Sequence, residues 1–188
     1  MEYKRKKKKK KLWVILVSLW TFFLAVTFTW ISRLLLRNLR SVAISFILLI
    51  FIIFIGIIFD VIGTAVTAAE EKPFHAKASK KIYGAKKSIY LVRHADQVAN
   101  FCNDVIGDIS GIVSGVIGTV IIINVSLLAE INEVHLSILM AGVISAATVG
   151  GKALGKVLAI NKPTDVVLFV ARILTAMDRF YFWRKTNR

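Results

Sequence analysis

Four long runs of apolar residues follow one another along the chain and dominate its pattern. They cover Leu12 to Leu36, Val42 to Ile62, Val105 to Ala129 and Leu136 to Ile160. Each run is at least as long as the roughly 20 residues that a helix needs to cross a bilayer. None alternates with a period of two, as the strands of a membrane barrel would. The pattern therefore predicts an all-α, polytopic membrane protein with about four transmembrane helices.

The first run imitates a secretory signal, because the basic segment Met1 to Lys11 precedes it. A signal peptide has an apolar region of about 7 to 15 residues that ends at a small-residue cleavage site. The run from Leu12 to Leu36 is longer and has no such site. We therefore expect a retained transmembrane helix, with a segment that inserts only halfway as the alternative.

Two further segments combine apolar and charged residues and are expected to form cytoplasmic helices at the membrane surface. In Glu70 to Phe101, lysines alternate with Ile, Tyr and Val side chains. Such lysines can meet anionic lipid headgroups, although a solvated basic helix that only sets the orientation explains them equally well. Asp165 to Trp183 is interrupted by charges and ends in four aromatic residues, which is typical of an interfacial helix.

Composition supports a membrane location and excludes several other classes of protein. Hydrophobic residues make up 56% of the 188 residues, and the formal net charge is +15. A soluble domain usually has about 45–50% apolar residues and a more balanced surface. The single cysteine, Cys102, excludes a disulfide framework and an all-cysteine metal site within one chain. Membrane lipids are the expected partners, and no nucleic acid is expected.

The distribution of Lys and Arg between the apolar runs predicts the topology. The N-terminal lysines, the basic segment Glu70 to Arg93 and the basic C-terminal tail belong in the cytoplasm. The connection Glu130 to His135 has two glutamates and no Lys or Arg, so it belongs outside. We expect a multi-pass protein of the cell membrane with both termini cytoplasmic. Three arginines violate the rule unless a tight hairpin lets them reach the outer headgroups: Arg33, Arg37 and Arg40.

One short motif resembles a catalytic sequence. Leu91 to Asp96 reads Leu-Val-Arg-His-Ala-Asp and is similar to the strand-end motif of histidine phosphatases, in which the His accepts a phosphoryl group. That chemistry needs a soluble α/β domain with a second His and further arginines around one pocket. His75 and His135 are the only other histidines, and the topology places His135 outside. A motif without its structural setting carries little weight, so we do not expect an enzyme.

Glycines in the third apolar run suggest close helix packing. Their spacing of four, four and three residues places them in one stripe along a helix: Gly107, Gly111, Gly115 and Gly118. Small residues let a second helix approach closely in a membrane. The stripe therefore predicts a packing face, and a homodimer is expected without specifying its interface.

Ionisable and polar residues within or beside the apolar runs are the candidate functional residues. They are Asp60, Asn103, Asp104, Asp108, Ser110, Lys152 and Lys156. A charge at membrane depth costs about 2.5–3.5 kcal/mol on insertion scales and normally faces a partner or a wet cavity. Asp104 and Lys156 could lie near the cytoplasmic interface, where the cost is smaller.

Three stretches that contain these residues resemble a known family: Asp60 to Ala65, Ile106 to Asp108 and Lys152 to Lys156, with the basic segment Ala85 to Phe101 between the first two. Together they resemble the transmembrane domain of the cyclin-M (CNNM) and CorB/CorC magnesium transporters. That family has a Ser-x-Ser-Glu-Thr-Ala-like turn, a basic cytoplasmic segment, an Ile-Gly-Asn-like step and a Glu-x-x-Pro-Lys helix end. The resemblance divides the chain into residues 1–40, a basic tail with an extra transmembrane helix, and residues 41–188, the family-like domain.

The resemblance implies a divalent-cation transporter for Mg²⁺ or Co²⁺, with oxygen ligands from Asp60, Asn103, Asp108 and Ser110. The sequence departs from the family where Gly63 and Lys152 stand in place of glutamates, Gly155 in place of the Pro and Asp108 in place of the Asn. The nucleotide-binding CBS domains of the family do not follow in this sequence. Lys152 could act as an internal counter-ion that pairs with Asp108. The alternative is therefore a non-transporting scaffold or accessory protein with a buried Asp–Lys pair.

Overall fold

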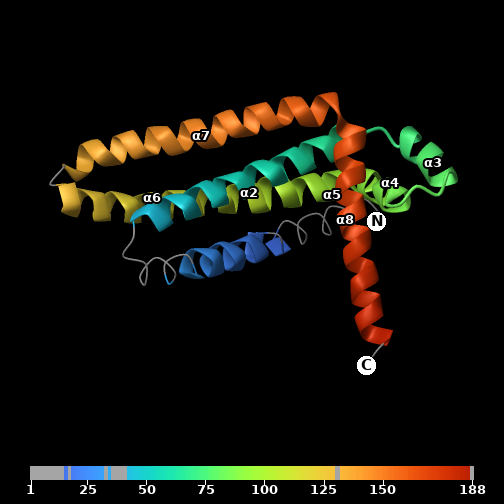
Figure 1. Cartoon of the computed structure of the whole chain (residues 1–188), viewed down its shortest axis with the longest axis horizontal. Coiled ribbons are helices and arrows are strands. Elements are labelled where there is room, and N and C mark those ends of the chain that lie inside the picture. Colours follow the sequence, from blue (N-terminus) through green and yellow to red (C-terminus); the bar gives the residue numbers. More distant parts are fainter. Residues whose placement is uncertain (1–14, 17, 32–33, 35–41, 130–131, 187–188) are drawn as a thin grey trace, which may run out of the picture. The chain divides into compact units, whose positions relative to one another are not determined.

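The computed structural model describes residues 15–16, 18–31, 34, 42–129 and 132–186, with side chains up to residue 179. All the named elements in this part of the chain are helices (Figure 1). The all-α class predicted from the sequence is therefore confirmed. In chain order, the elements are α2 (Val42–Ala68), α3 (Lys72–Ser79), α4 (Ala85–Arg93), α5 (Ala95–Ala99), the π-helix η1 (Asn100–Gly107), α6 (Asp108–Ala129), α7 (Glu133–Asn161) and α8 (Pro163–Thr186).

Three helices within these residues are long and apolar enough to cross a membrane. They are α2, the continuous helix Ala95–Ala129 formed by α5, η1 and α6, and α7. They correspond to the second, third and fourth predicted runs. Within the first run, the structure describes a shorter apolar helix, Ser18–Ile31. The N-terminal lysine cluster and the hairpin arginines Arg33, Arg37 and Arg40 lie outside the described residues.

The residues divide into two compact units. The first contains the chain up to Ile53 together with Ile109–Ser145, and the second contains Phe54–Asp108 together with Ala146–Arg188. In the first unit, α6 buries Val113, Ile117 and Ile121 at a spacing of four residues, which is one face of a helix. α2, α6 and α7 each contribute residues to both units.

The glycine stripe predicted on the third run forms only part of a packing face. At Gly118, a Cβ atom would come within 2.6 Å of Ile144 Cδ1 on α7, so this glycine permits a close approach within the first unit. Gly111 and Gly115 have no such neighbour within 4 Å in the described structure. A packing role for these two glycines therefore stays a prediction.

The core of the second unit joins α8 to the helices of the basic segment. Phe74 of α3, Leu91 of α4, and Val167 and Ala171 of α8 are buried in one cluster with residues of α2. α4 packs against both α3 and α8. The segment predicted as helical, Glu70 to Phe101, is thus helical but broken into short pieces.

The break between α3 and α4 has a backbone cause. Lys81 and Gly84 both adopt a positive φ, of 54° and 86°. A Cβ atom on Gly84 would lie 2.9 Å from Arg172 Cγ and 3.0 Å from the Arg172 backbone nitrogen on α8. Glycine is needed here both for its conformation and for the close approach of the two backbones. This turn sets how α4 lies on α8.

Candidate charged site on α2

A single carboxylate is buried in the apolar helix α2. Asp60 is only 4% exposed, and its Oδ2 atom accepts no hydrogen bond from the residues that the structure describes. The Lys156 ammonium of α7 forms an ion pair with it, with Nζ 3.8 Å from Oδ2. The two atoms are close enough for an ion pair but too far apart for a hydrogen bond. The Lys156 side chain is 51% exposed, so one partner is enclosed and the other is open.

Glycines on α7 bring Lys156 to Asp60. Gly151 and Gly155 lie directly against Ile57 and Val61 of α2, so that a Cβ atom on either glycine would overlap those side chains. Small residues four apart allow two helix backbones to approach closely. Lys156 follows Gly155 in the sequence, and it therefore reaches the turn of α2 that carries Asp60.

Asn103 adds a second buried oxygen on the same side of α2. Its side chain lies against the Cα atom of Gly63, which is almost one turn beyond Asp60. The Oδ1 atom of Asn103 is buried and accepts no hydrogen bond from the described residues. Asn103 belongs to η1, and π-helical turns occur frequently at functional sites. The sequence identified Asn103 as a candidate, but no sequence pattern indicated the π-helix.

The other predicted site residues are not part of this arrangement. Asp108 and Asp104 are exposed, and Ser110 is buried in the other compact unit. Lys152 is half-buried, and a Cβ atom on Gly107 would lie 3.5 Å from its Nζ atom. Within the described part of the chain, no ion pair joins Asp108 to Lys152. The observed pair instead uses the lysine one turn further along α7.

The four predicted oxygen ligands, Asp60, Asn103, Asp108 and Ser110, differ in burial. Mg²⁺ favours an octahedron of oxygen atoms and usually keeps several waters. Asp60 offers a buried oxygen on α2 and Asn103 offers one beside it, whereas the Asp108 side chain is exposed. The described residues include no group of three or more His, Cys, Asp or Glu side chains that could hold a metal ion. The predicted metal site therefore stays a prediction.

A second charged cluster lies on α3 and α4. Glu71 Oε1 accepts hydrogen bonds from His75 Nε2 at 2.8 Å and from Arg93 Nε at 2.6 Å. Both hydrogen bonds lower the pKa of the Glu71 carboxyl below its ordinary value. The bond from His75 has the larger effect, and the bond from Arg93 the next largest. Arg93 ends α4, and His94 caps it through a contact between His94 Nδ1 and the Tyr90 carbonyl oxygen. The phosphatase-like motif thus lies at a helix end and not at the end of a strand.

Comparison of the chain with protein-family models, with curated proteins and with solved structures gives no match. The function is therefore inferred from the residues and their arrangement alone.

Proposed function

We propose that the chain is an integral membrane protein of the cell membrane that crosses the bilayer with α2, Ala95–Ala129 and α7. The support is the exposed apolar surface of these helices. Within their most apolar windows, only 22%, 33% and 6% of the residues are buried inside the protein. Apolar surface of this extent needs a lipid or protein partner. A homodimer could cover part of it, and the open glycines Gly111 and Gly115 of α6 are the proposed place for such a contact.

Within the membrane, we propose that the protein acts as a non-transporting scaffold or accessory protein. The observation that carries this proposal is the 3.8 Å separation between Lys156 Nζ and Asp60 Oδ2. A buried carboxylate needs a positive partner, because an isolated charge in an apolar medium is costly. The ammonium supplies that charge from within the chain, at the position that a bound cation would otherwise occupy. The pair then fixes α7 against α2.

Divalent-cation transport of the CorB type is the second candidate. It is favoured by the two buried oxygens without donors, Asp60 Oδ2 and Asn103 Oδ1. Mg²⁺ sites often use one or two carboxylates and retain water for the remaining positions. In this case Lys156, whose side chain is half exposed, would have to move away from Asp60 when an ion arrives.

Substitutions of the pair, with a matched lysine as control, distinguish the two candidates. For a scaffold, Lys156→Gln should lower the free energy of unfolding in detergent by about 1–3 kcal/mol, since Asp60 loses its partner but Lys156 is already half solvated. The double variant Asp60→Asn with Lys156→Gln should recover part of this loss. Lys152→Gln makes the same change one turn away on α7 and should have a smaller effect.

Liposome flux gives the second readout. The scaffold proposal expects no Mg²⁺ flux from the wild-type protein and no rise in its melting temperature when Mg²⁺ is added. A ligand that binds only the folded state would stabilise it. Wild-type flux that is lost in Asp60→Asn and in Asn103→Ala would instead establish the transporter. Equal stability of Lys156→Gln and Lys152→Gln would contradict the proposed pair.

A further inference from the structure

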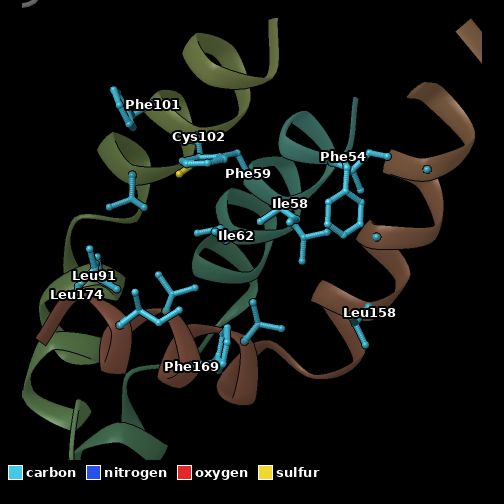
Figure 2. Close-up of a pocket in the computed structure, with 18 residues that line it drawn as sticks. Phe54, Ile58, Phe59, Ile62, Leu91, Phe101, Cys102, Leu158, Phe169 and Leu174 are labelled. Atoms are coloured by element: carbon cyan, nitrogen blue, oxygen red, sulfur yellow. The ribbon is translucent and has the colours of Figure 1, made fainter. Parts of the chain in front are cut away.

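An apolar groove lies in the second unit, between α2, α7, α8 and the helices of the basic segment. Its volume is about 720 Å³, within the range of roughly 300–1,000 Å³ typical of ligand pockets. Figure 2 shows Ile58 and Ile62 of α2, Phe101 of η1 and Phe169 of α8 among the side chains that line it. Apart from the thiol of Cys102, the lining side chains offer no polar group. Such a groove suits a hydrocarbon chain.

A second hollow, of about 490 Å³, lies between the α3–α4 turn and α8. It is lined by three lysines, Lys81, Lys86 and Lys87, together with Thr175 and Asp178. Lys87 Nζ is 2.7 Å from Asp178 Oδ2, so that lysine is already paired. Lys81 and Lys86 form no ion pair with any residue that the structure describes, and both are exposed. The hollow therefore has two ammonium groups available for an anion.

The two hollows follow one another along the contact between α4 and α8. On α4, Lys87 lines the basic hollow and Leu91, one turn later, lines the apolar groove. On α8, the order runs the opposite way, because Leu174 lines the groove and Asp178, one turn later, lines the basic hollow. Figure 2 shows Leu91 and Leu174 together at one end of the groove. Hydrocarbon-lined space and positive charge are thus adjacent.

We propose that these hollows form one binding site for an anionic glycerophospholipid. An acyl chain lies in the apolar groove, and the phosphate is held by Lys81 and Lys86. The proposal rests on the proposed membrane location, which supplies the lipid. A second copy of this chain fits less well as the occupant, because the chain carries a net charge of +15 and like charges oppose association at a basic surface.

The test measures lipids retained by the full-length chain after purification in a mild non-ionic detergent. Dioleoyl phosphatidylglycerol and dioleoyl phosphatidylcholine are added in equal amounts, and native mass spectrometry reports the bound species. The wild-type chain should retain a single lipid and prefer phosphatidylglycerol by about fivefold or more, since one surface lysine contributes about 1 kcal/mol towards an anionic lipid. Equal retention of the two lipids would overturn the headgroup assignment.

Matched variants test each half of the site. Leu158 and Leu154 are both exposed on α7, but only Leu158 lines the groove. Leu158→Gln should lower retention of both lipids by about tenfold, because a polar group enters the hydrocarbon site. Leu154→Gln should leave retention unchanged. Ile173→Gln, paired with Met177→Gln on α8, repeats the comparison in case Leu158→Gln misfolds. If both variants of each pair lost lipid retention equally, the assignment of the groove as the acyl-chain site would be overturned.

The role of the lysines in the basic hollow is tested with its own control variant. The double variant Lys81→Gln with Lys86→Gln should abolish the preference for phosphatidylglycerol and keep the binding of phosphatidylcholine. Lys72→Gln with Lys80→Gln removes the same charge outside the hollow and should keep the preference. Carbonate extraction of wild-type membranes is measured separately. A chain that stays in the pellet but retains no lipid overturns this site alone, whereas a chain that is extracted overturns the proposed membrane location as well.

Discussion

Asp60 and Glu71 are two carboxylates in opposite surroundings. Asp60 is enclosed by apolar side chains and has one ammonium at 3.8 Å. Glu71 is at the surface between α2 and α3 and accepts two short hydrogen bonds. Asp60 is therefore stabilised by one ion pair without a hydrogen bond between its two partners, whereas Glu71 is stabilised by two hydrogen bonds at the protein surface. Removal of a partner should therefore change stability at Asp60 and mainly change the titration at Glu71.

The pKa of Glu71 gives a prediction at this scale. Donation from His75 and Arg93 favours the ionised carboxylate, so its pKa should lie below the ordinary value of 4.5. The stabilisation is fully present above that ordinary value and is lost as the pH falls through the lowered pKa. A ¹³C-glutamate NMR titration should show this, and Arg93→Gln should raise the pKa of Glu71. Lys80→Gln is the control, since Lys80 forms no ion pair with Glu71 among the described residues. A Glu71 pKa at or above 4.5 in the wild type would contradict the bonding described.

Single residues show where the sequence was informative and where it was not. A carboxylate inside an apolar run is visible without a structure, because its burial is costly, and Asp60 was identified on that basis. The lysine that pairs with it was not predictable. Lys152 and Lys156 are one turn apart on the same helix, so only the position of α7 against α2 decides between them. The predicted pair of Lys152 with Asp108 is not the pair that the structure has.

At the scale of elements, the approach of α7 to α2 depends on glycine. Gly155→Ala should lower the free energy of unfolding by about 1–3 kcal/mol, because the added methyl group overlaps Val61 and the helices must separate. Gly150→Ala is the matched control on the same helix, since nothing lies within 4 Å of a Cβ atom there in the described structure. It should be neutral or stabilise by up to about 1 kcal/mol.

Chemical denaturation in detergent, followed by circular dichroism, measures both glycine variants. If Gly155→Ala is as stable as Gly150→Ala, the close contact between the helices does not exist. Equal destabilisation of both variants would also contradict the contact with Val61, because alanine favours a helix over glycine and Gly150 has no neighbour to overlap in the described structure.

Length and hydropathy predicted α2, α6 and α7 because a long apolar run has few alternatives to a helix. Their ends were less predictable. The helix of the third run begins at Ala95 instead of Val105, because α5 and η1 continue it into the basic segment. Three of the four glycines in the stripe lie on α6 and Gly107 ends η1, and spacing alone does not tell which of them another helix covers. The resemblance to the CorB family stays a prediction.

At the scale of the whole molecule, the alternation of basic and acidic connections predicts the orientation of the chain. After Cys102→Ala removes the native thiol, cysteines introduced at Lys86 and Lys185 should be protected from impermeant thiol reagents in intact cells. A cysteine at Glu133 should react, because the connection around it carries acidic residues and no Lys or Arg. Permeabilised cells provide the control for accessibility. Labelling at Lys86 with protection at Glu133 would reverse the proposed topology.

The π-helix η1 also determines how the long helix Ala95–Ala129 responds to a change in its number of residues. Its hydrogen bonds close one residue later than those of an α-helix, so it accommodates an extra residue without breaking the long helix Ala95–Ala129. Deletion of one codon within Asn100–Gly107 would let the segment wind as an ordinary α-helix. The helix on either side would keep nearly the same rotation around its axis, because the wider π-helical turns had absorbed the deleted residue. Hydropathy would hardly change, yet the side chains within η1 would be rearranged, and Asn103 would lose its contact with Gly63.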